Sequence, residues 1–328
     1  MPTRIARVFV LSALLMISTG AAVTDAQPAP ASTVTLRVGY LPIAECAHLY
    51  VGITKKFFAE EGLTLQLQPM KGGSAILPAI QTGDLDLGFT NVPSIIMIDS
   101  HLPATDTHYL VSLTGATYER SANLNHALLV AKSSHLTARE LGSPGTRFAL
   151  NTTLNIEELM LRRYLAQKNF APHALHIDQI AFPDMPRALR AGDVDVISVV
   201  EPFIEPIVKS GEARILARQY IEVSPETLVA TYAVSRQWLA ANRAIATRFC
   251  RAMMKADAYI QNNPGEVRQI VGSFTKIQKA DLPIIGMPAF SLEVKADRLQ
   301  ELIDEMAKYH FITQKPSARS LLAEKLIR

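Results

Sequence analysis

The chain has 328 residues, of which 48% are hydrophobic and 19% charged, a composition typical of a globular protein too long for one ordinary core. Its formal net charge of +3 falls to about +2 when the first 26 residues are left out, so it lacks the concentrated basic charge that nucleic-acid binding needs. We therefore expect two lobes and no nucleic-acid partner.

The N-terminus has the three parts of a secretory signal peptide. Arg4 and Arg7 precede the apolar run "VFVLSALLMISTGAAV", and small residues then end at Ala26. No later stretch approaches 18 continuous apolar residues, the length of a strong membrane span. We expect cleavage of residues 1–26 near Ala26 and release of a soluble protein into a periplasm, after which "QPAPAS" forms a short linker.

Strand and helix patterns then alternate along the chain. The first series has apolar alternation typical of strands and helical spacing of apolar residues between them, in the order strand 33–40, helix 47–61, strand 63–70, a short helix ending at Gly83, and strand 85–90. The second series follows Gly142, in the order strand 146–152, helix 155–170, strand 174–182, helix 185–191 and strand 194–203. Because strands joined through helices pair in parallel, both series predict α/β architecture.

The two series share a corner sequence. "AIQTGDLDLGF" begins at Ala79 and "ALRAGDVDVIS" begins at Ala188, 109 residues later. Each predicts a helix that ends at a glycine and leads directly into a buried strand, either because two lobes repeat one unit or because such corners commonly use the same loop chemistry. The aspartates lie at strand beginnings, so we interpret them as solvated turn residues and not as metal ligands: Asp84, Asp86, Asp193 and Asp195.

Five loops follow the carboxyl ends of the predicted strands, where open α/β sheets bind their ligands. Their sequences are "GYLPIAECAH", "KGGSA", "TNVPS", "NTTLN" and "EPF". The first four are polar or glycine-rich and each opens a helix, so their unpaired N–H groups favour a polar or anionic ligand. No nucleophile, general base and orienting residue cluster in them, which favours binding over catalysis.

The stretch "LRVGYLPIAECAHLYVGITKKFFAEEGLTLQLQPMKGGSAILPAIQTGDLDLGFTNVPSII" resembles the first lobe of the periplasmic substrate-binding proteins of ABC importers for nitrate, taurine, alkanesulfonates and thiamine-precursor pyrimidines. The similarity continues through "LTARELGSPGTRFALNTT", "RALRAGDVDVISVVEPF" and "YAVSRQWLAANRAIATRFCRAMMKADAYIQNNP". It implies a type II, Venus-flytrap fold in which each lobe is a mostly parallel sheet flanked by helices. The expected lobes are 33–133 with 230–328, and 134–229, with chain crossings near 133–137 and 227–231.

The resemblance also implies a function and a set of binding residues. The protein would capture a small solute between its lobes, need no cofactor, act as a monomer and deliver the solute to an ABC permease in the inner membrane. The ligand-binding residues would lie on the matching loops and near the return crossing: Tyr40, Pro42, Glu45, Gly73, Ser74, Thr90, Asn91, Thr152, Thr153, Glu201 and Tyr232. Some of these could instead serve as helix caps, since Ser74 and Thr153 are natural N-cap residues.

The ligand's charge stays open at this point. Glu45 and Glu201 would repel a simple oxyanion, whereas a zwitterion such as an aminosulfonate or an amine-bearing heterocycle would use them, unless the carboxylates cap helices or face solvent. Many relatives carry an aromatic residue where this chain has Val200, which argues against ring stacking there. His101, His108 and His126 lack metal-ligand spacing, and we interpret them as surface residues or ordinary polar contacts.

Two other function classes are kept. An exported enzyme of the same fold, such as a desulfinase, would need a nucleophilic cysteine, but Cys46 lies several residues beyond the expected position. An exported sensor would present its ligand to a receptor instead of an importer. Cys46 and Cys250 are the only cysteines, either two partly buried thiols or a disulfide.

Overall fold

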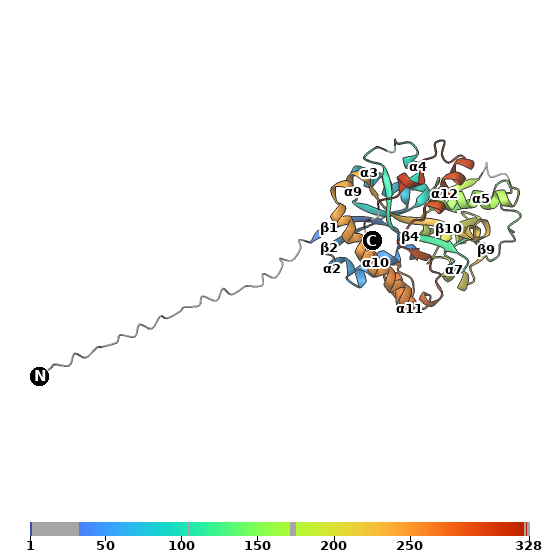
Figure 1. Cartoon of the computed structure of the whole chain (residues 1–328). Coiled ribbons are helices and arrows are strands. Elements are labelled where there is room, and N and C mark those ends of the chain that lie inside the picture. The colour runs from blue at the N-terminus through green and yellow to red at the C-terminus, as the bar shows by residue number, and fades with distance from the viewer. Residues whose placement is uncertain (2–32, 104, 171–174, 325, 327–328) are drawn as a thin grey trace. The chain divides into compact units, whose positions relative to one another are not determined.

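The computed structural model describes residues 1, 33–103, 105–170, 175–324 and 326 (Figure 1). The predicted signal peptide, Met1 apart, and the linker after it lie outside the described residues. The chain divides into residues 1–32 and a unit from Thr33 to Arg328, which contains every helix and strand described. Among the described residues, no helix is both long enough and apolar enough to cross a bilayer.

The first sheet has six strands in the order β11-β4-β10-β3-β1-β2. Their bounds are β1 (Val34–Tyr40), β2 (Leu63–Pro69), β3 (Leu87–Asn91), β4 (Leu110–Arg120), β10 (Glu226–Ser235) and β11 (Ala289–Ser291). β1 pairs in parallel with β2 and β3, as the strand and helix alternation predicts. β10 runs antiparallel to β3 and β4, and β11 antiparallel to β4, so the sheet is mixed and not mostly parallel.

The second sheet repeats this arrangement in the order β7-β6-β8-β5-β9. Its strands are β5 (His126–Ala131), β6 (Arg147–Leu150), β7 (His176–Gln179), β8 (Val196–Val200) and β9 (Ala213–Ala217). β6 pairs in parallel with β7 and β8, while β5 runs antiparallel to β8 and β9. The order β7-β6-β8-β5 thus matches β2-β1-β3-β10 of the first sheet.

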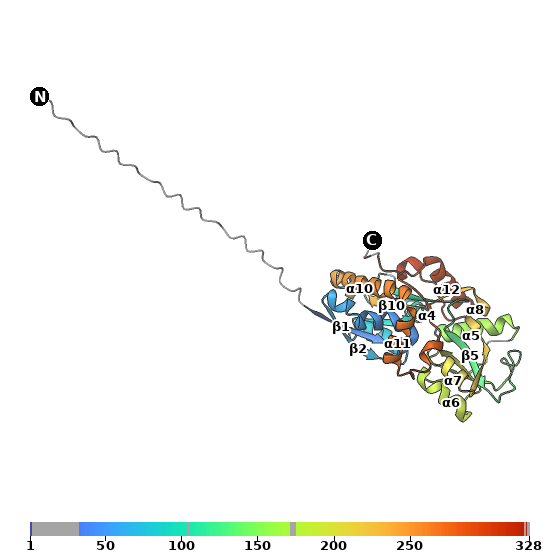
Figure 2. The same ribbon diagram turned by 90° about the horizontal axis from the view of Figure 1, so that it is seen from below.

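Helices flank both sheets. They are α1 (Ala47–Thr54), α2 (Phe57–Glu60), α3 (Gly73–Thr82), α4 (Val92–Asp99), α5 (Ile156–Gln167), α6 (Met185–Ala191), α7 (Glu205–Lys209), α8 (Gln219–Val223), α9 (Arg236–Ala241), α10 (Arg243–Asn262), α11 (Pro264–Thr275) and α12 (Ala296–Lys308). The single helix predicted over 47–61 is divided at Lys56, whose φ of 63° is left-handed. In Figures 1 and 2, β1, β2 and α10 lie together on one side of the unit. The green and yellow elements lie on the other side, among them α5 and α7 in both views, β9 as labelled in Figure 1 and β5 as labelled in Figure 2.

The repeated corner has the same geometry in both sheets. The Arg37 backbone N–H donates to Asp86 at 2.7 Å, and its guanidinium Nη2 donates to the same carboxylate at 2.8 Å. Arg147 makes the matching bonds to Asp195 at 2.9 and 2.8 Å. Each aspartate opens the third strand of its series and ties it to the first strand. The two corner sequences therefore reflect a repeated structural unit, and these two aspartates are partners of arginines and not simply solvated.

Strand pairing shows where the chain changes sheet. It leaves the first sheet between Arg120 and His126 and returns between Ala217 and Glu226. Both positions precede the crossings expected at 133–137 and 227–231, because β5 pairs within the second sheet and the start of β10 within the first. Which helices move with which sheet remains a prediction, so the two-lobe division does too.

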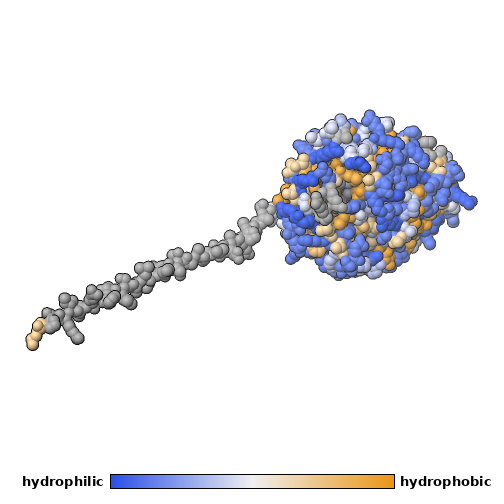
Figure 3. Space-filling model, in the orientation of Figure 1, coloured by the Kyte–Doolittle hydropathy of each residue, from blue (hydrophilic) through white to orange (hydrophobic). Residues whose placement is uncertain are grey.

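Buried apolar side chains fill the layers between sheets and helices. α10 contributes one such face, which includes Phe249, Met253 and Ala256, and α12 another through Leu302 and Met306. Hydrophilic residues cover most of the face seen in Figure 3. The elements that carry the loops therefore pack on shared apolar layers.

Candidate functional site

A cavity of about 30 Å³ lies where loops of the two sheets meet. On the first sheet's side it is lined by the loop that follows β1, the start of α3, the end of β3 and the first half of β10. On the second sheet's side it is lined by the start of β5, the loop that follows β6, the start of α5 and a residue that follows β7. The lining residues are Leu41, Ile43, Glu45, Gly73, Phe89, Thr90, Asn91, His126, Asn151, Asn155, Ile156, Glu157, Phe182, Val229 and Ala230. The carboxyl ends of the parallel strands therefore face a shared site, as the loop analysis predicts.

Three helices begin at this cavity. Asn91 caps α4 by accepting the Ser94 N–H at 3.0 Å, and Asn155 caps α5 by accepting the Glu158 N–H at 3.1 Å. α3 begins at Gly73, which lines the cavity, and its N-cap residue, Gly72, offers no side-chain cap. A Cβ on Gly73 would lie 2.4 Å from the Thr90 hydroxyl, which explains why glycine opens this helix.

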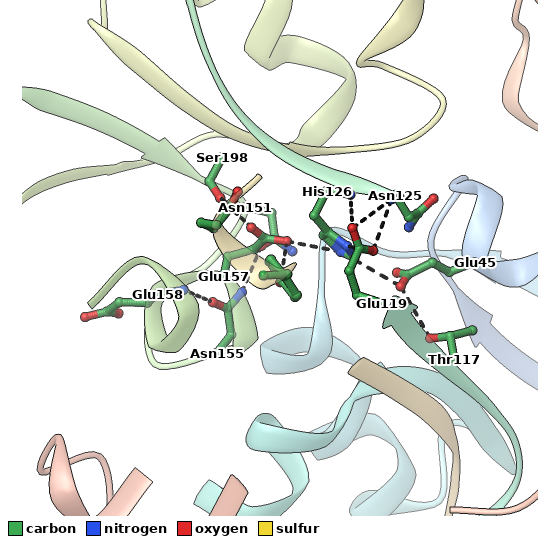
Figure 4. A network of polar contacts seen from close by, with 12 residues as sticks. Glu45, Thr117, Glu119, Asn125, His126, Asn151, Asn155, Glu157, Glu158 and Ser198 are labelled. Atoms are coloured by element: carbon green, nitrogen blue, oxygen red, sulfur yellow. Dashed lines mark hydrogen bonds and ion pairs between the residues drawn. The ribbon is translucent and has the colours of Figure 1, made fainter. Parts of the chain in front are cut away.

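A buried acidic cluster surrounds His126 beside the cavity (Figure 4). His126 Nδ1 lies 3.0 Å from Glu119 Oε2, and its Nε2 lies 3.4 Å from Glu157 Oε1. The Tyr220 ring stacks on the imidazole at 4.1 Å between centroids, and its hydroxyl donates to Glu157 at 3.0 Å. Because Glu119 is the last residue but one of β4 and His126 begins β5, the cluster sits at the first crossing between the sheets.

Glu45 is the third carboxylate of the cluster and lies in the short 3₁₀ turn Ala44–Cys46. Its Oε1 accepts from the Thr117 hydroxyl at 3.3 Å and lies 3.9 Å from His126 Nε2. The backbone of this turn also joins the two sheets, since the Ala44 N–H donates to the Glu201 carbonyl at 3.0 Å.

Burial and charge shift the titration of this cluster. Desolvation raises the pKa of Glu45 from 4.5 to about 7, against the attraction of His126. Desolvation alone would lower the pKa of His126, but Glu157, Glu119 and Glu45 together raise it from 6.5 to about 9. The imidazole is thus a cation at neutral pH, held by carboxylates from three segments, while Glu45 titrates near neutrality.

The structure brings four of the predicted binding residues to the cavity: Glu45, Gly73, Thr90 and Asn91. Of the others that are described, none lines it: Tyr40, Pro42, Thr152, Thr153, Glu201 and Tyr232. The side chain of Ser74 is outside the described residues. Thr152 nonetheless supports the wall, because its hydroxyl accepts from the Asn155 amide at 2.9 Å. Whether these residues bind a ligand stays a prediction.

The sequence left three roles open for Glu201, which were to contact the ligand, to cap a helix or to face solvent, and in the structure its carboxylate binds backbone N–H groups. Its Oε1 accepts the Gly286 N–H at 3.0 Å and its Oε2 accepts the Ile204 N–H at 3.3 Å. Desolvation raises the pKa of Glu201 to about 7 although these N–H groups oppose the shift. This carboxylate therefore fixes the backbone around it and does not face the cavity.

Tyr232 is fully buried in the core of the first sheet, with its ring 5.1 Å from that of Phe89. Cys46 and Cys250 are both free and buried, so the structure has two thiols and no disulfide between them. Burial raises the pKa of the Cys46 thiol well above its ordinary value. This thiol is protonated and does not line the cavity.

His126 is not a surface residue, because only 2% of it is exposed. Of our two interpretations the polar contact holds, and its partners are buried carboxylates beside the cavity that His126 lines. In the loop "NTTLN" the threonines were the predicted binding residues, whereas its two asparagines, Asn151 and Asn155, line the cavity. Glu157 was also missed. An asparagine followed by two glutamates is a sequence signal for a helix start, and it could have pointed to this end of α5.

A larger cavity of about 500 Å³ lies between β4, α10 and C-terminal residues. Its wall is mostly apolar, with Leu113, Met254 and Leu322 among its members, and none of the predicted binding residues lines it. Within the described ranges, no group of three His, Cys, Asp or Glu side chains has a geometry suited to a metal ion.

The NMT1-like family model matches residues 29–273. The nitrate import ATP-binding protein NrtC of Synechococcus elongatus is 25% identical over 231 residues, which are 68% of this chain but 34% of NrtC, so the chain spans about a third of that relative's length.

Two solved structures share the fold. The alkanesulfonate-binding protein SsuA of Xanthomonas axonopodis, bound to MOPS, is 16% identical with a TM-score of 0.74, and the match covers 90% of this chain and 100% of SsuA. The periplasmic nitrate-binding protein NrtA of Synechocystis is 14% identical with a TM-score of 0.71, covering 89% and 85% of the two chains. The α/β fold with two mixed sheets is therefore that of periplasmic binding proteins. Since the family model matches well over half of its residues, the chain belongs to the NMT1-like family.

Proposed function

We propose that this protein is the periplasmic solute-binding component of an ABC importer. The observation that carries the proposal is the cavity itself, which is lined by loops from both sheets and by the N-terminal ends of three helices. A ligand held there would contact both sheets at once, so binding would favour the conformation in which they meet. The protein would be exported by its predicted signal peptide, act as a monomer in the periplasm and deliver its ligand to a permease.

The ligand is a small polar molecule, for which sulfonates, taurine-like zwitterions, nitrate-like anions and pyrimidine-like heterocycles are the candidates. With a volume of about 30 Å³, the cavity holds one or two waters in the described conformation, so a ligand enters only when the sheets separate. Binding and release are then coupled to opening, as transport requires.

Catalysis is not part of the proposal. The buried Cys46 thiol, whose pKa is raised, lacks the activation that a nucleophile needs. The same cavity would also serve a sensor, which differs only in its partner.

The test is thermal unfolding of the purified protein against a panel that contains each candidate ligand class, including bicarbonate and aromatic carboxylates. A ligand at about 1,000 times its Kd adds roughly 4 kcal/mol to the free energy of unfolding and raises Tm by several degrees. The ligand should be recovered unchanged, and a consumed ligand would instead support the enzyme.

A matched pair of variants ties binding to the cavity. Thr90→Val keeps the side-chain shape at the cavity wall and should weaken binding about 2- to 10-fold through a lost hydrogen bond. Thr64→Val makes the same change at an exposed position of β2 and should leave the affinity unaltered. Equal effects of both substitutions would refute the cavity as the binding site.

A further inference from the structure

The buried carboxylates around the cavity carry more negative charge than the described cationic side chains near them neutralise. Glu45, Glu119 and Glu157 are each 4% exposed or less, and His126 is the one basic side chain among the residues that line the cavity. Arg218 donates to the His126 carbonyl at 3.2 Å, but its guanidinium also pairs with Glu205 at 3.1 Å. The His126 imidazolium balances the charge of one carboxylate. Ionisation of all three glutamates therefore leaves an excess of negative charge, which is costly because the groups are buried.

The three carboxylates differ in how many partners they already have. Glu157 accepts from the Ser198 and Tyr220 hydroxyls, and Glu119 accepts the backbone N–H groups of Asn125 and His126. Glu45 has only the long contacts to Thr117 and His126 described above, both through Oε1. Its Oε2 has no hydrogen-bond donor among the described residues, so this oxygen can accept from a ligand in the cavity that Glu45 lines.

Asn125 supplies an independent observation. Its side chain is fully buried, and neither its amide oxygen nor its amide nitrogen has a partner in the part of the chain that is described. It precedes His126 directly, and Figure 4 draws its side chain on the same side of the imidazole as Glu45. Asn125 borders the cluster and is not among the residues that line the cavity, and a buried amide without a partner costs free energy unless a water or a ligand satisfies it.

Building on the proposed function, we propose that the ligand presents a positively charged nitrogen group to Glu45, so the site selects amine- or amidine-bearing molecules against simple oxyanions. Such a group donates hydrogen bonds to the free Glu45 oxygen and offsets the excess charge of the cluster. An oxyanion in the cavity would meet the carboxylates of Glu45 and Glu157, and the one cation there, His126, is already engaged by Glu119 and Glu157. An acceptor on the same ligand can bind the uncapped N-terminus of α3 at Gly73, so a zwitterion also fits.

The experiment measures calorimetric binding of small probes of each charge class to the purified protein. The cationic probes are methylamine, ethanolamine and acetamidine, the zwitterion is taurine, and the anions are nitrate, bicarbonate and methanesulfonate. We expect binding of a cationic or zwitterionic probe and none of the anions. Failure of every cationic and zwitterionic probe to bind at millimolar concentration overturns the inference.

Glu45→Gln removes the charge and keeps the shape of the side chain. It should weaken binding of the nitrogen-bearing probe at least about tenfold, because hydrogen bonds to charged groups are the strong ones. Glu60→Gln is the matched control, since Glu60 is exposed and pairs with Lys255 away from the cavity. The inference is overturned if Glu45→Gln binds the nitrogen-bearing probe with unchanged affinity. It is also overturned if the unsubstituted protein binds an anion more tightly than it binds the nitrogen-bearing probe.

A second measurement needs no variant and holds even if Glu45→Gln fails to fold. Affinity for the nitrogen-bearing probe should rise between pH 6 and 8, where Glu45 ionises, whereas a site for anions would weaken over the same range. The other titratable groups near it are Glu119, Glu157, His126, Tyr220 and Cys46. His126 and the Cys46 thiol, whose pKa burial raises, both stay protonated in this range. If an anion binds to the unsubstituted protein and its binding is lost in Thr90→Val, the charge preference is refuted but the proposed function stands.

Discussion

Removal of the His126 charge should cost the protein a large part of its stability. His126→Gln retains a polar side chain but leaves Glu119 and Glu157 without the cation that lies 3.0 and 3.4 Å from their oxygens. At an effective dielectric constant of about 20, each of these contacts is worth roughly 5 kcal/mol before desolvation and carboxylate repulsion are subtracted. The rise in the His126 pKa from 6.5 to about 9 corresponds to about 3 kcal/mol of net stabilisation.

The direction of the pH dependence follows from that shift. Because the folded protein holds the proton of His126 more tightly than the unfolded chain, its stabilising contribution is complete below pH 6.5 and is lost as the pH rises through about 9. We therefore expect His126→Gln to lower the free energy of unfolding by about 3 kcal/mol at pH 6 and by much less at pH 10.

Urea unfolding followed by circular dichroism at both pH values measures this difference. His176→Gln is the matched control, because His176 is exposed and its nearest carboxylate, Asp178, is 3.8 Å away; it should cost under about 0.5 kcal/mol. A double variant that also carries Glu119→Gln should recover part of the loss, since it removes one of the carboxylates left unpaired. A loss below about 1 kcal/mol at pH 6, or one that does not shrink by pH 10, would refute the assignment of His126 as a buried cation.

Three further substitutions test the rest of the site and fold. Gly73→Ala should lower the free energy of unfolding by about 1–3 kcal/mol and weaken ligand binding, since its Cβ would lie 2.4 Å from the Thr90 hydroxyl; unfolding and calorimetry check both. Asp86→Asn should cost about 1 kcal/mol in urea unfolding, because Arg37 loses its charged partner at a partly exposed corner. Glu201→Gln should cost about 1–2 kcal/mol yet leave ligand affinity unchanged, and a tenfold weaker affinity would restore Glu201 to the binding site.

Local pattern was enough to predict the elements and the edge of the sheet at which the cavity lies. Apolar alternation and helical spacing predicted the two βαβ series, because strand and helix periods are properties of short segments. The repeated corners raised the possibility that one unit occurs twice, and the structure decides for it, with Gly83 and Gly192 both at positive φ. The same reasoning placed Glu45 and Asn91 correctly beside the cavity, since the carboxyl ends of parallel strands share one edge.

The crossings and the acidic cluster depended on contacts between distant segments. Nothing local assigns β5 to the second sheet, because its apolar pattern would suit either one, and only pairing with β8 and β9 decides. Likewise, the residues next to His126 in the sequence do not indicate that its side chain is buried among carboxylates.

The sequence by itself therefore determined the repeated α/β architecture and the loops that carry the site, since both follow from short-range periodicity and turn chemistry. Tertiary structure decided which side chains define the site's charge. Glu45, Glu119 and Glu157 are separated by 74 and 38 residues along the chain and meet at His126 only because the chain passes from one sheet to the other there. Their burial, which no local pattern reveals, is what raises the pKa of Glu45 and makes the charge of this cavity important.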